Sequence, residues 1–250
     1  MSSGIRRNLS LSKAEKAHRP AAGGDAARTP PGAIRAAYRR NPRGTAVSGG
    51  YLDSPKGWES SIIEKMKKSS VLANRLRRLG EHRVYYSRKI GSFTQVLDFK
   101  PAVYDRRHIL RDPSEFKELR FDSIDEATLV LLDLNSSLFV WFCTVYSDCR
   151  HVNKREVEAF PLPYDDLENE SKAARSLATK LMKSLKDTSE MRRMGALDIQ
   201  CIIPKLSKPI IDEIDALLAK HYGFTEEELD FIVNYDIKYR MGDELAAGGE

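Results

Sequence analysis

Cysteine is scarce in this chain of 250 residues, where only Cys143, Cys149 and Cys201 occur. Three cysteines at these spacings match neither a disulfide framework nor a zinc knuckle, which predicts a protein of the reducing cytoplasm. No apolar run approaches the ~20 residues that a transmembrane helix needs, so we expect no membrane partner.

The familiar catalytic motifs are also missing. There is no glycine-rich phosphate loop, GxGxxG, HExxH, paired CxxC or Gly-x-Ser-x-Gly elbow. The Asn/Asp-Pro-Pro-aromatic tetrapeptide of amino-methylating enzymes is absent too, since Asn41-Pro42-Arg43-Gly44 does not match it. The sequence therefore predicts no catalytic residue, no cofactor-binding residue and no metal ligand in this chain.

Charge is divided unevenly. Residues 1–56 carry 11 basic and 3 acidic side chains, and residues 62–120 carry 15 and 7. Residues 121–250 carry 15 basic and 25 acidic side chains, so the formal net charge is only +5. A basic block followed by an acidic one predicts one part that faces a polyanion and another that is solvated or docks against a partner.

The first 57 residues are rich in Ala, Gly, Pro, Ser and Arg and lack apolar periodicity. This composition predicts a disordered basic arm over 1–57, and we expect a second short tail over 243–250. Three interpretations of the arm are open: a tail that helps to hold nucleic acid, an Arg-rich transit segment, or an unselected extension of a truncated gene. The last is the simplest.

Beyond the arm, the pattern indicates an α+β fold, with a small, mostly antiparallel sheet and a predominantly helical C-terminal half. Apolar residues at helical spacing over 62–79 predict a helix that Gly80 ends. The β-rich runs at 84–88 and 93–99 predict a hairpin or two neighbouring strands, and 117–121 predicts another short strand.

Capping patterns locate the later helices. Three pairs match the capping box, namely Ser123 with Glu126, Asn153 with Glu156, and Thr225 with Glu228. Residues 169–187 indicate an exposed amphipathic helix, and Gly223 ends a helix that Ser207 caps. The apolar stripe of that last helix needs a cover, and it consists of Ile210, Ile214, Leu217 and Leu218. The segment 225–236 can supply part of this cover, and we expect a docked partner to supply the rest.

Two weaker signals could indicate metal chemistry. Asp98 with Glu115 and Lys117 has the residue types of a nuclease that binds a divalent ion. A Glu-x-Lys tripeptide arises easily by chance when 31% of residues are charged, and another begins at Glu170, so a solvated strand is the simpler interpretation. His221 lies on the inner edge of a predicted helix, where a core role is simpler than a ligand role.

Binding remains as the best-supported class of function. Cations and aromatic residues interleave over 83–111, and a polar loop follows at 151–155. Cations neutralise phosphates, and Arg or Asn side chains can read base edges, although an ordinary basic sheet surface would have the same composition. The candidate DNA-binding residues are Arg83, Tyr86, Arg88, Lys89, Arg106, Arg107, Arg111, His151, Asn153, Lys154 and Arg155. The phosphate contacts are expected mainly from Arg88, Lys89, Arg106 and Arg107.

Several blocks of the sequence resemble one known family. LVLLDLNSSLFVWF (129–142), followed by SDCRHVNKREVEAFPLP (147–163), resembles the TaqI-like C-terminal specificity domain. That domain is the target-recognition part of adenine-specific DNA methyltransferases and of fused type IIG restriction–modification enzymes. Residues 84–101 and 207–242 are similar to the regions that precede this hallmark and that end the long methylases of the group. The resemblance spans roughly 58–242, in the family's order.

The resemblance implies a role in DNA target recognition. In the complete enzymes, a catalytic domain flips an adenine from the duplex and methylates its N6 with S-adenosyl-L-methionine, while the specificity domain reads the sequence. Because the cofactor and catalytic motifs are missing here, the resemblance implies a detached specificity portion, from a split or truncated gene. Such a portion would bind duplex DNA, hold no cofactor itself and could pair with a separate methyltransferase catalytic domain.

The expected organisation is a target-recognition-like α+β domain over 58–163 and a helical region over 164–242, between the arm and the tail. Two rival functions stay open. One is a non-DNA interaction module or an inactive gene remnant, and the other is an active methyltransferase or nuclease subunit.

Overall fold

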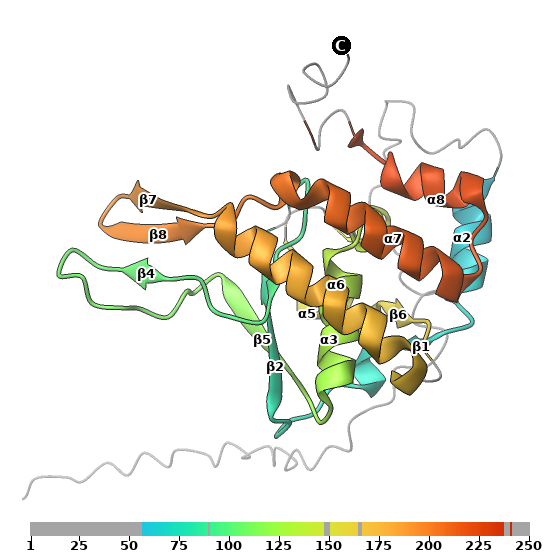
Figure 1. Ribbon diagram of the computed structural model, residues 1–250, viewed down its shortest axis with the longest axis horizontal. Helices are drawn as coiled ribbons and strands as arrows, with labels where there is room; N and C mark the ends of the chain where they lie inside the picture. The colour runs from blue at the N-terminus through green and yellow to red at the C-terminus, as the bar shows by residue number, and fades with distance from the viewer. Residues whose placement is uncertain (1–56, 90, 148–150, 165–166, 238–240, 242–250) are drawn as a thin grey trace, which may run out of the picture.

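The computed structural model of the chain has an α+β fold, as predicted. Helices pack on one face of a small sheet, and a second sheet projects from the body of the protein (Figure 1). The structure describes residues 57–89, 91–147, 151–164, 167–237 and 241. Except for Gly57, the predicted arm over 1–57 and the tail over 243–250 lie outside these residues.

The central sheet has the strand order β3-β2-β5 and is antiparallel throughout. Strand β2 (His82–Ser87) pairs with β3 (Val96–Leu97) on one side and with β5 (Phe116–Phe121) on the other. Alternate residues of the two long strands are buried, including Val84 and Leu119, because one face of the sheet packs on the core. The strand predictions for this part of the chain are confirmed.

The projecting sheet was not predicted. Strands β7 (Glu190–Met194) and β8 (Leu197–Cys201) form a hairpin around Gly195, which has a φ of 64°, and β8 also pairs with β4 (Val103–Tyr104). These strands lie within segments that we expected to be loop or helix. The turn needs a positive φ, which glycine adopts without steric cost.

The helix predicted over 62–79 is too long. Helix α2 (Trp58–Met66) ends where a run without apolar residues begins, and Leu79 is 85% exposed. Instead, β1 (Ser70–Val71) pairs with β6 (Pro161–Leu162), and a 3₁₀ turn, η1 (Leu72–Asn74), follows. Pairing with a distant strand thus satisfies backbone groups that a longer helix would have paired locally.

The core is built on α3 (Ile124–Asn135) and α4 (Ser137–Tyr146), which are almost entirely buried over 129–143. Ser136 separates the two helices, and its hydroxyl accepts a hydrogen bond from the Phe139 N–H at 3.0 Å. In the described part of the chain, no single helix is long and apolar enough to cross a membrane. The pair α3 and α4, bent by 66°, meets that criterion only when the two are taken together.

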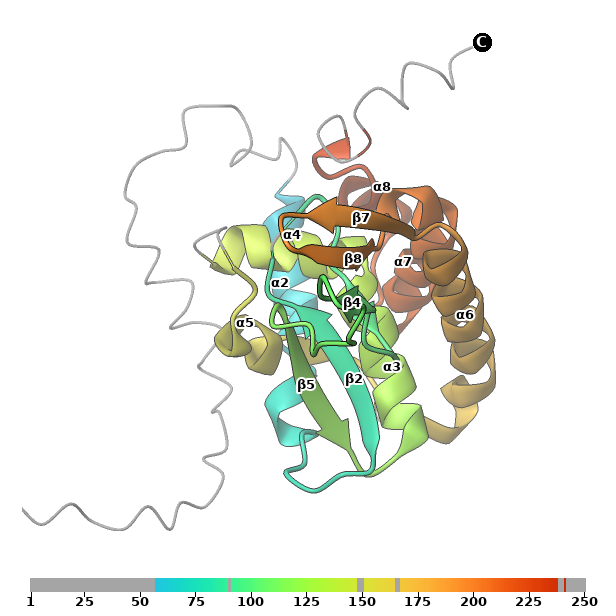
Figure 2. The ribbon, with the colours of Figure 1, turned by 90° about the vertical axis from the view of Figure 1, so that its left-hand side faces the viewer.

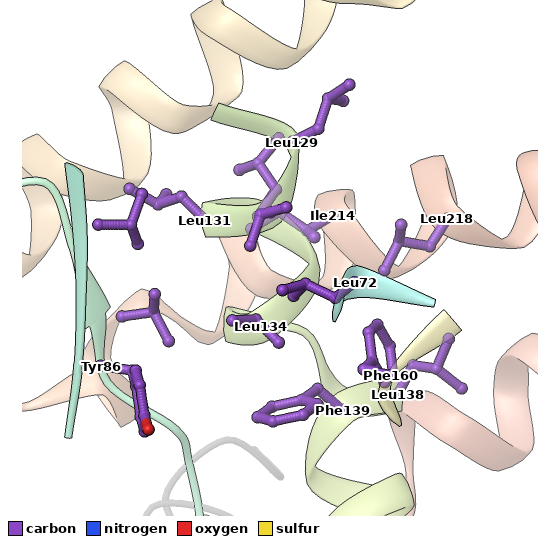
Figure 3. Packing of buried hydrophobic residues seen from close by; sticks show 14 of the residues in the cluster. Leu72, Tyr86, Leu129, Leu131, Leu134, Leu138, Phe139, Phe160, Ile214 and Leu218 are labelled. Carbon is purple, nitrogen blue, oxygen red and sulfur yellow. The ribbon is translucent and has the colours of Figure 1, made fainter. Parts of the chain in front are cut away.

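The remaining helices cover this core: α5 (Lys154–Ala159), α6 (Leu167–Asp187), α7 (Lys208–Tyr222) and α8 (Glu226–Val233), with the 3₁₀ turn η2 (Pro204–Ser207) before α7. Figure 3 shows Ile214 and Leu218 of α7 packed with Leu129 and Leu134 of α3. Ile210, Ile214 and Leu218 of the stripe are therefore buried within the chain itself, while Leu217 is half-buried, and docking of a partner stays a prediction. One apolar cluster includes residues from both predicted regions, 58–163 and 164–242.

Candidate nucleic-acid interface

A hollow of ≈ 360 Å³ opens at the end of the central sheet, beside the start of α5. Tyr86 of β2 lies directly opposite Lys117 of β5, so both side chains leave the same face of the sheet. The core covers the same face of the sheet at Val84 and Leu119, but at the hollow the side chains of Lys117 and Arg88 reach solvent. The hollow is lined by Tyr86, Arg88, Lys117, Glu118, Leu119, Val152, Asn153 and Lys154.

Backbone pairing brings the two predicted binding segments together at this hollow. The Val152 N–H donates to the Arg88 carbonyl at 2.9 Å, and Lys89 forms an isolated antiparallel bridge with His151. His151 and Val152 thereby extend the sheet, whereas Lys154 and Arg155, which we expected in the same loop, form the first turn of α5 (Figure 2 shows α5 beside β5). The sequence suggested both segments independently, but it gave no indication that they are neighbours.

Two of the candidates serve the fold at this site. Tyr86 is only 4% exposed, so its ring is unavailable for stacking on a base (Figure 3), and burial, followed by the nearby Glu158 charge, raises the pKa of its hydroxyl. The Asn153 N–H donates to the buried Glu156 carboxylate at 3.0 Å, completing the predicted capping box of α5. The Asn153 amide also donates to the His151 carbonyl at 3.3 Å, so it is engaged locally rather than presented to a ligand.

Four candidate cations are engaged in ion pairs within the protein. They are Arg83 with Glu118 at 3.7 Å, Arg111 with Asp105 at 2.5 Å, Lys154 with Glu158 at 3.1 Å, and Arg155 with Glu156 at 2.6 Å. A cation that already has a carboxylate partner gains less from a phosphate, because the existing pair must be broken or shared.

Among the described residues, the other four candidate cations have no acidic partner within ion-pair distance. They are Arg88, Lys89, Arg106 and Arg107, the same four that we expected to meet phosphates. Lys117 shares this property and was missed by the sequence analysis, which treated it only as part of a possible nuclease motif. Its alternation with the buried Leu119 was the available signal, but the strand register was needed to place it beside Arg88.

Arg106 and Arg107 lie elsewhere, on a tight loop beyond β4 at the end of the projecting sheet (Figure 1). Asp105 organises this loop, since its Oδ1 accepts hydrogen bonds from the N–H groups of Arg107 at 2.8 Å and Ile109 at 3.0 Å. The bond from Ile109, together with that from the Arg111 guanidinium, lowers the pKa of the Asp105 carboxyl. The predicted basic segment therefore divides into two surfaces: the hollow and the tip of this loop.

The conspicuous LDLNSS motif has structural roles. The Asn135 side chain accepts from the Val96 N–H at 3.1 Å and donates to the Val96 carbonyl at 2.7 Å, fastening β3 to the end of α3. The capping box predicted at the start of α3 is only half formed. The Ser123 hydroxyl accepts from the Asp125 N–H, but Glu126 pairs with Arg75 at 3.2 Å instead of bonding back to the backbone of Ser123.

Metal chemistry gains no support from the geometry. Within the described ranges, no three His, Cys, Asp or Glu side chains are close enough together to hold an ion. Asp98, part of the possible nuclease motif, faces Lys186 at 3.8 Å. The His221 ring packs edge-on against Tyr164 at a centroid distance of 5.1 Å, in agreement with a core role.

No family model matches this chain, and comparisons with curated proteins and with solved structures find no significant match either. The resemblance to the TaqI-like specificity domain therefore stays a hypothesis, and the function must be argued from the two surfaces themselves.

Proposed function

We propose that this protein binds duplex DNA and is the target-recognition portion of an adenine-specific restriction–modification methyltransferase, without a methyl-transfer site of its own. Such a portion would work in the cytoplasm, in keeping with the low cysteine content. The observation that carries the DNA-binding proposal is the set of cations without acidic partners: Arg88, Lys89 and Lys117 around the hollow, and Arg106 and Arg107 on the loop. The assignment to methyltransferases rests on the sequence resemblance alone.

The distribution of the ion pairs favours a polyanionic ligand. On a surface that only needs to be soluble, cations can form ion pairs with neighbouring carboxylates, as Arg83 does with Glu118 and Lys154 with Glu158. The lining of the hollow holds three cations, Arg88, Lys117 and Lys154, against one carboxylate, Glu118, so the cations repel one another and a phosphate would relieve that repulsion. Phosphate binding also releases counterions condensed on DNA, which adds a favourable and salt-dependent contribution to binding.

Fluorescence anisotropy with a labelled duplex, measured across a range of salt concentrations, tests this proposal. If about four phosphates are engaged, log K falls against log salt with a slope of roughly −3 to −4. Replacing Arg88, Lys89, Arg106 and Arg107 with Ala should remove most of that slope. A variant with Lys172, Arg175, Lys180 and Lys183 of α6 replaced by Ala loses the same charge and is the matched control.

The two variants separate local contacts from net charge. The control variant should keep a slope close to that of the wild type, since α6 lies at the opposite side of the view from α5 and β5, whose residues line the hollow (Figure 2). Equal losses in both variants would mean that binding depends on overall charge alone, and the interface proposed here would be wrong. Absence of binding by the wild type would favour a non-DNA module or a gene remnant.

A catalytic partner is part of the proposal. A recognition domain alone lacks the clamp that a catalytic half provides, so specific methylation should appear only when a methyltransferase domain is supplied in trans. Co-purification followed by a methylation-protection assay measures this. If the mixture methylates no better than the catalytic half alone, this chain is not a working specificity subunit.

S-adenosyl-L-methionine should bind only the catalytic half, because no segment of this chain resembles the loop that holds it. Calorimetry with the purified protein should show no heat of binding, and micromolar affinity would contradict the proposal.

A further inference from the structure

The loop from Asp105 to Arg111 is held in one conformation by the Asp105 carboxylate. Besides the two backbone N–H groups bonded to Oδ1, the Arg111 guanidinium donates to Oδ2 from Nε at 3.0 Å and from Nη2 at 2.5 Å. The side chain of Asp105 is only 17% exposed. One carboxylate thus accepts four hydrogen bonds, all from within the loop that encloses it.

The backbone of the loop closes on itself in the same compact way. The Asp105 N–H donates to the Ile109 carbonyl at 3.1 Å, and the His108 N–H donates to the Asp105 carbonyl at 2.9 Å. Tyr104 and Leu110 form an antiparallel bridge at its base. His108 has a φ of 56°, a left-handed conformation that is uncommon for residues other than glycine.

This closed turn presents cations and apolar side chains at its outer surface. Arg106 and Arg107 are exposed and have no acidic partner in the described part of the chain, while Ile109 and Leu110 are 48% and 63% exposed. Adjacent arginines beside exposed aliphatic side chains suit a DNA groove, where guanidinium groups meet the backbone or base edges and apolar side chains contact the bases.

We propose that the Asp105-held loop enters a groove of the duplex as a preformed tip, with Arg106, Arg107 and Leu110 touching DNA and Asp105 acting as the positioning residue. This inference rests on the proposed function and names the part of the protein that makes the groove contact. Preforming the tip lowers the cost of ordering it on binding, which increases affinity without any additional contact.

The charge of Asp105 makes the inference testable. Removing the carboxylate should raise DNA affinity if only net charge matters, and lower it if the carboxylate positions the arginines. If only net charge matters, Asp105→Ala makes the protein more positive and strengthens DNA binding. If the carboxylate positions the arginines, the same substitution frees the loop, and affinity should fall by about threefold or more. Asp105→Asn should be intermediate, since its Oδ1 can still accept the two backbone hydrogen bonds.

Asp112→Ala is the matched control. Asp112 lies just beyond the loop, is exposed and pairs with Lys100 at 2.8 Å, so the control removes one negative charge from the same neighbourhood without touching the tip. Its affinity for a labelled duplex should equal or exceed that of the wild type. Circular dichroism and thermal unfolding of each variant verify that the rest of the fold is intact.

Salt dependence distinguishes the roles within the tip. Replacing Arg106 and Arg107 with Ala should reduce the salt slope by about 2, at roughly 0.9 per phosphate contact. Leu110→Ala should weaken binding with an unchanged slope, because an apolar contact displaces no counterions.

The possible failures are distinguishable. If the wild type binds DNA but Asp105→Ala binds as tightly as Asp112→Ala or tighter, the positioning role is wrong while the proposed function stands. If the Arg106 and Arg107 variant keeps the wild-type slope, the loop faces something other than DNA and the inference is also overturned. If the wild type itself does not bind duplex DNA, the proposed function fails first.

Discussion

The Ser137 backbone N–H donates to the Asp215 carboxyl oxygen Oδ1 at 2.8 Å, so a residue of α7 caps the first turn of α4. Ser136 caps the same turn from within the sequence, and both side chains are buried. An acidic group suits this position because the N-terminal N–H groups of a helix carry partial positive charge. The central helix of the core therefore depends on a contact between segments that are far apart in the chain.

Replacing Asp215 with Ala should destabilise the protein by about 2–3 kcal/mol, since buried N–H groups at the helix start lose a charged acceptor. Asp215→Asn keeps an oxygen at this position and should cost clearly less. Urea unfolding measures both, with Glu213→Ala on the exposed side of α7 as the control. Equal costs for the Ala and Asn variants would contradict the capping role.

Gly80 has a steric role that the sequence analysis misread as the end of a helix. A Cβ at this position would lie 2.4 Å from the Phe121 carbonyl oxygen, which is backbone and cannot swing away. Gly80→Ala should therefore cost about 1–3 kcal/mol through overpacking. Gly91→Ala, where the nearest atom would be 3.5 Å away, is the matched control and should be nearly neutral in the same unfolding experiment.

The parts of the fold that could be predicted are those with local causes. The caps at Asn153 and Thr225 depend on side chains that bond to backbone three residues away, and a sequence pattern records that spacing. The hairpin of β7 and β8 could not be predicted in this way, because every residue of β7 is exposed and its sequence, EMRRM, has no inward and outward alternation. Strand β7 is held by its pairing with β8 and by the ion pair between Arg193 and Asp198 at 2.9 Å.

The residue types of the candidate site could be predicted from the sequence, but their positions on the surface could not. Cations at 83–111 indicated a polyanion, yet only the ion pairs in the structure separate Arg88 and Arg106, which are available, from Arg83 and Arg111, which are engaged. Ion pairs between segments distant in sequence leave no local pattern. Lys117 was missed for the same reason, since its position depends on the register between β2 and β5.

Glu228 should stabilise the protein above mildly acidic pH. Burial of Glu228 opposes its charged form, but hydrogen bonds from Lys65, Ser61 and the Thr225 N–H outweigh this effect and lower the pKa of the carboxyl. Because the folded pKa lies below the ordinary value of 4.5, the stabilisation is present above that pH and is lost as pH falls through the folded pKa. In Glu228→Gln, thermal unfolding should show less loss of stability on acidification; an unchanged acid profile would contradict this.

Asp133 should have the opposite effect on the pH dependence of stability. Its carboxyl is fully buried and accepts a hydrogen bond from the Tyr164 hydroxyl at 2.6 Å, and burial raises its pKa well above the ordinary value of 3.8 despite that bond. In the described part of the chain, the second oxygen, Oδ2, has no hydrogen-bond partner. The folded protein therefore retains a proton that the unfolded chain releases, and its contribution to stability falls as pH rises from about 3.8 through the folded pKa.

Asp133→Asn removes this titration but leaves an oxygen to accept from Tyr164. The variant should gain stability relative to the wild type as pH rises, by up to about 1.4 kcal/mol per pH unit until the folded pKa is passed. Unfolding free energies measured between pH 4 and 8 test this, with the exposed Asp122→Asn as a control for the loss of a surface carboxylate. A constant difference between Asp133→Asn and wild type across that range would show that Asp133 titrates alike in the folded and unfolded states, contrary to its burial.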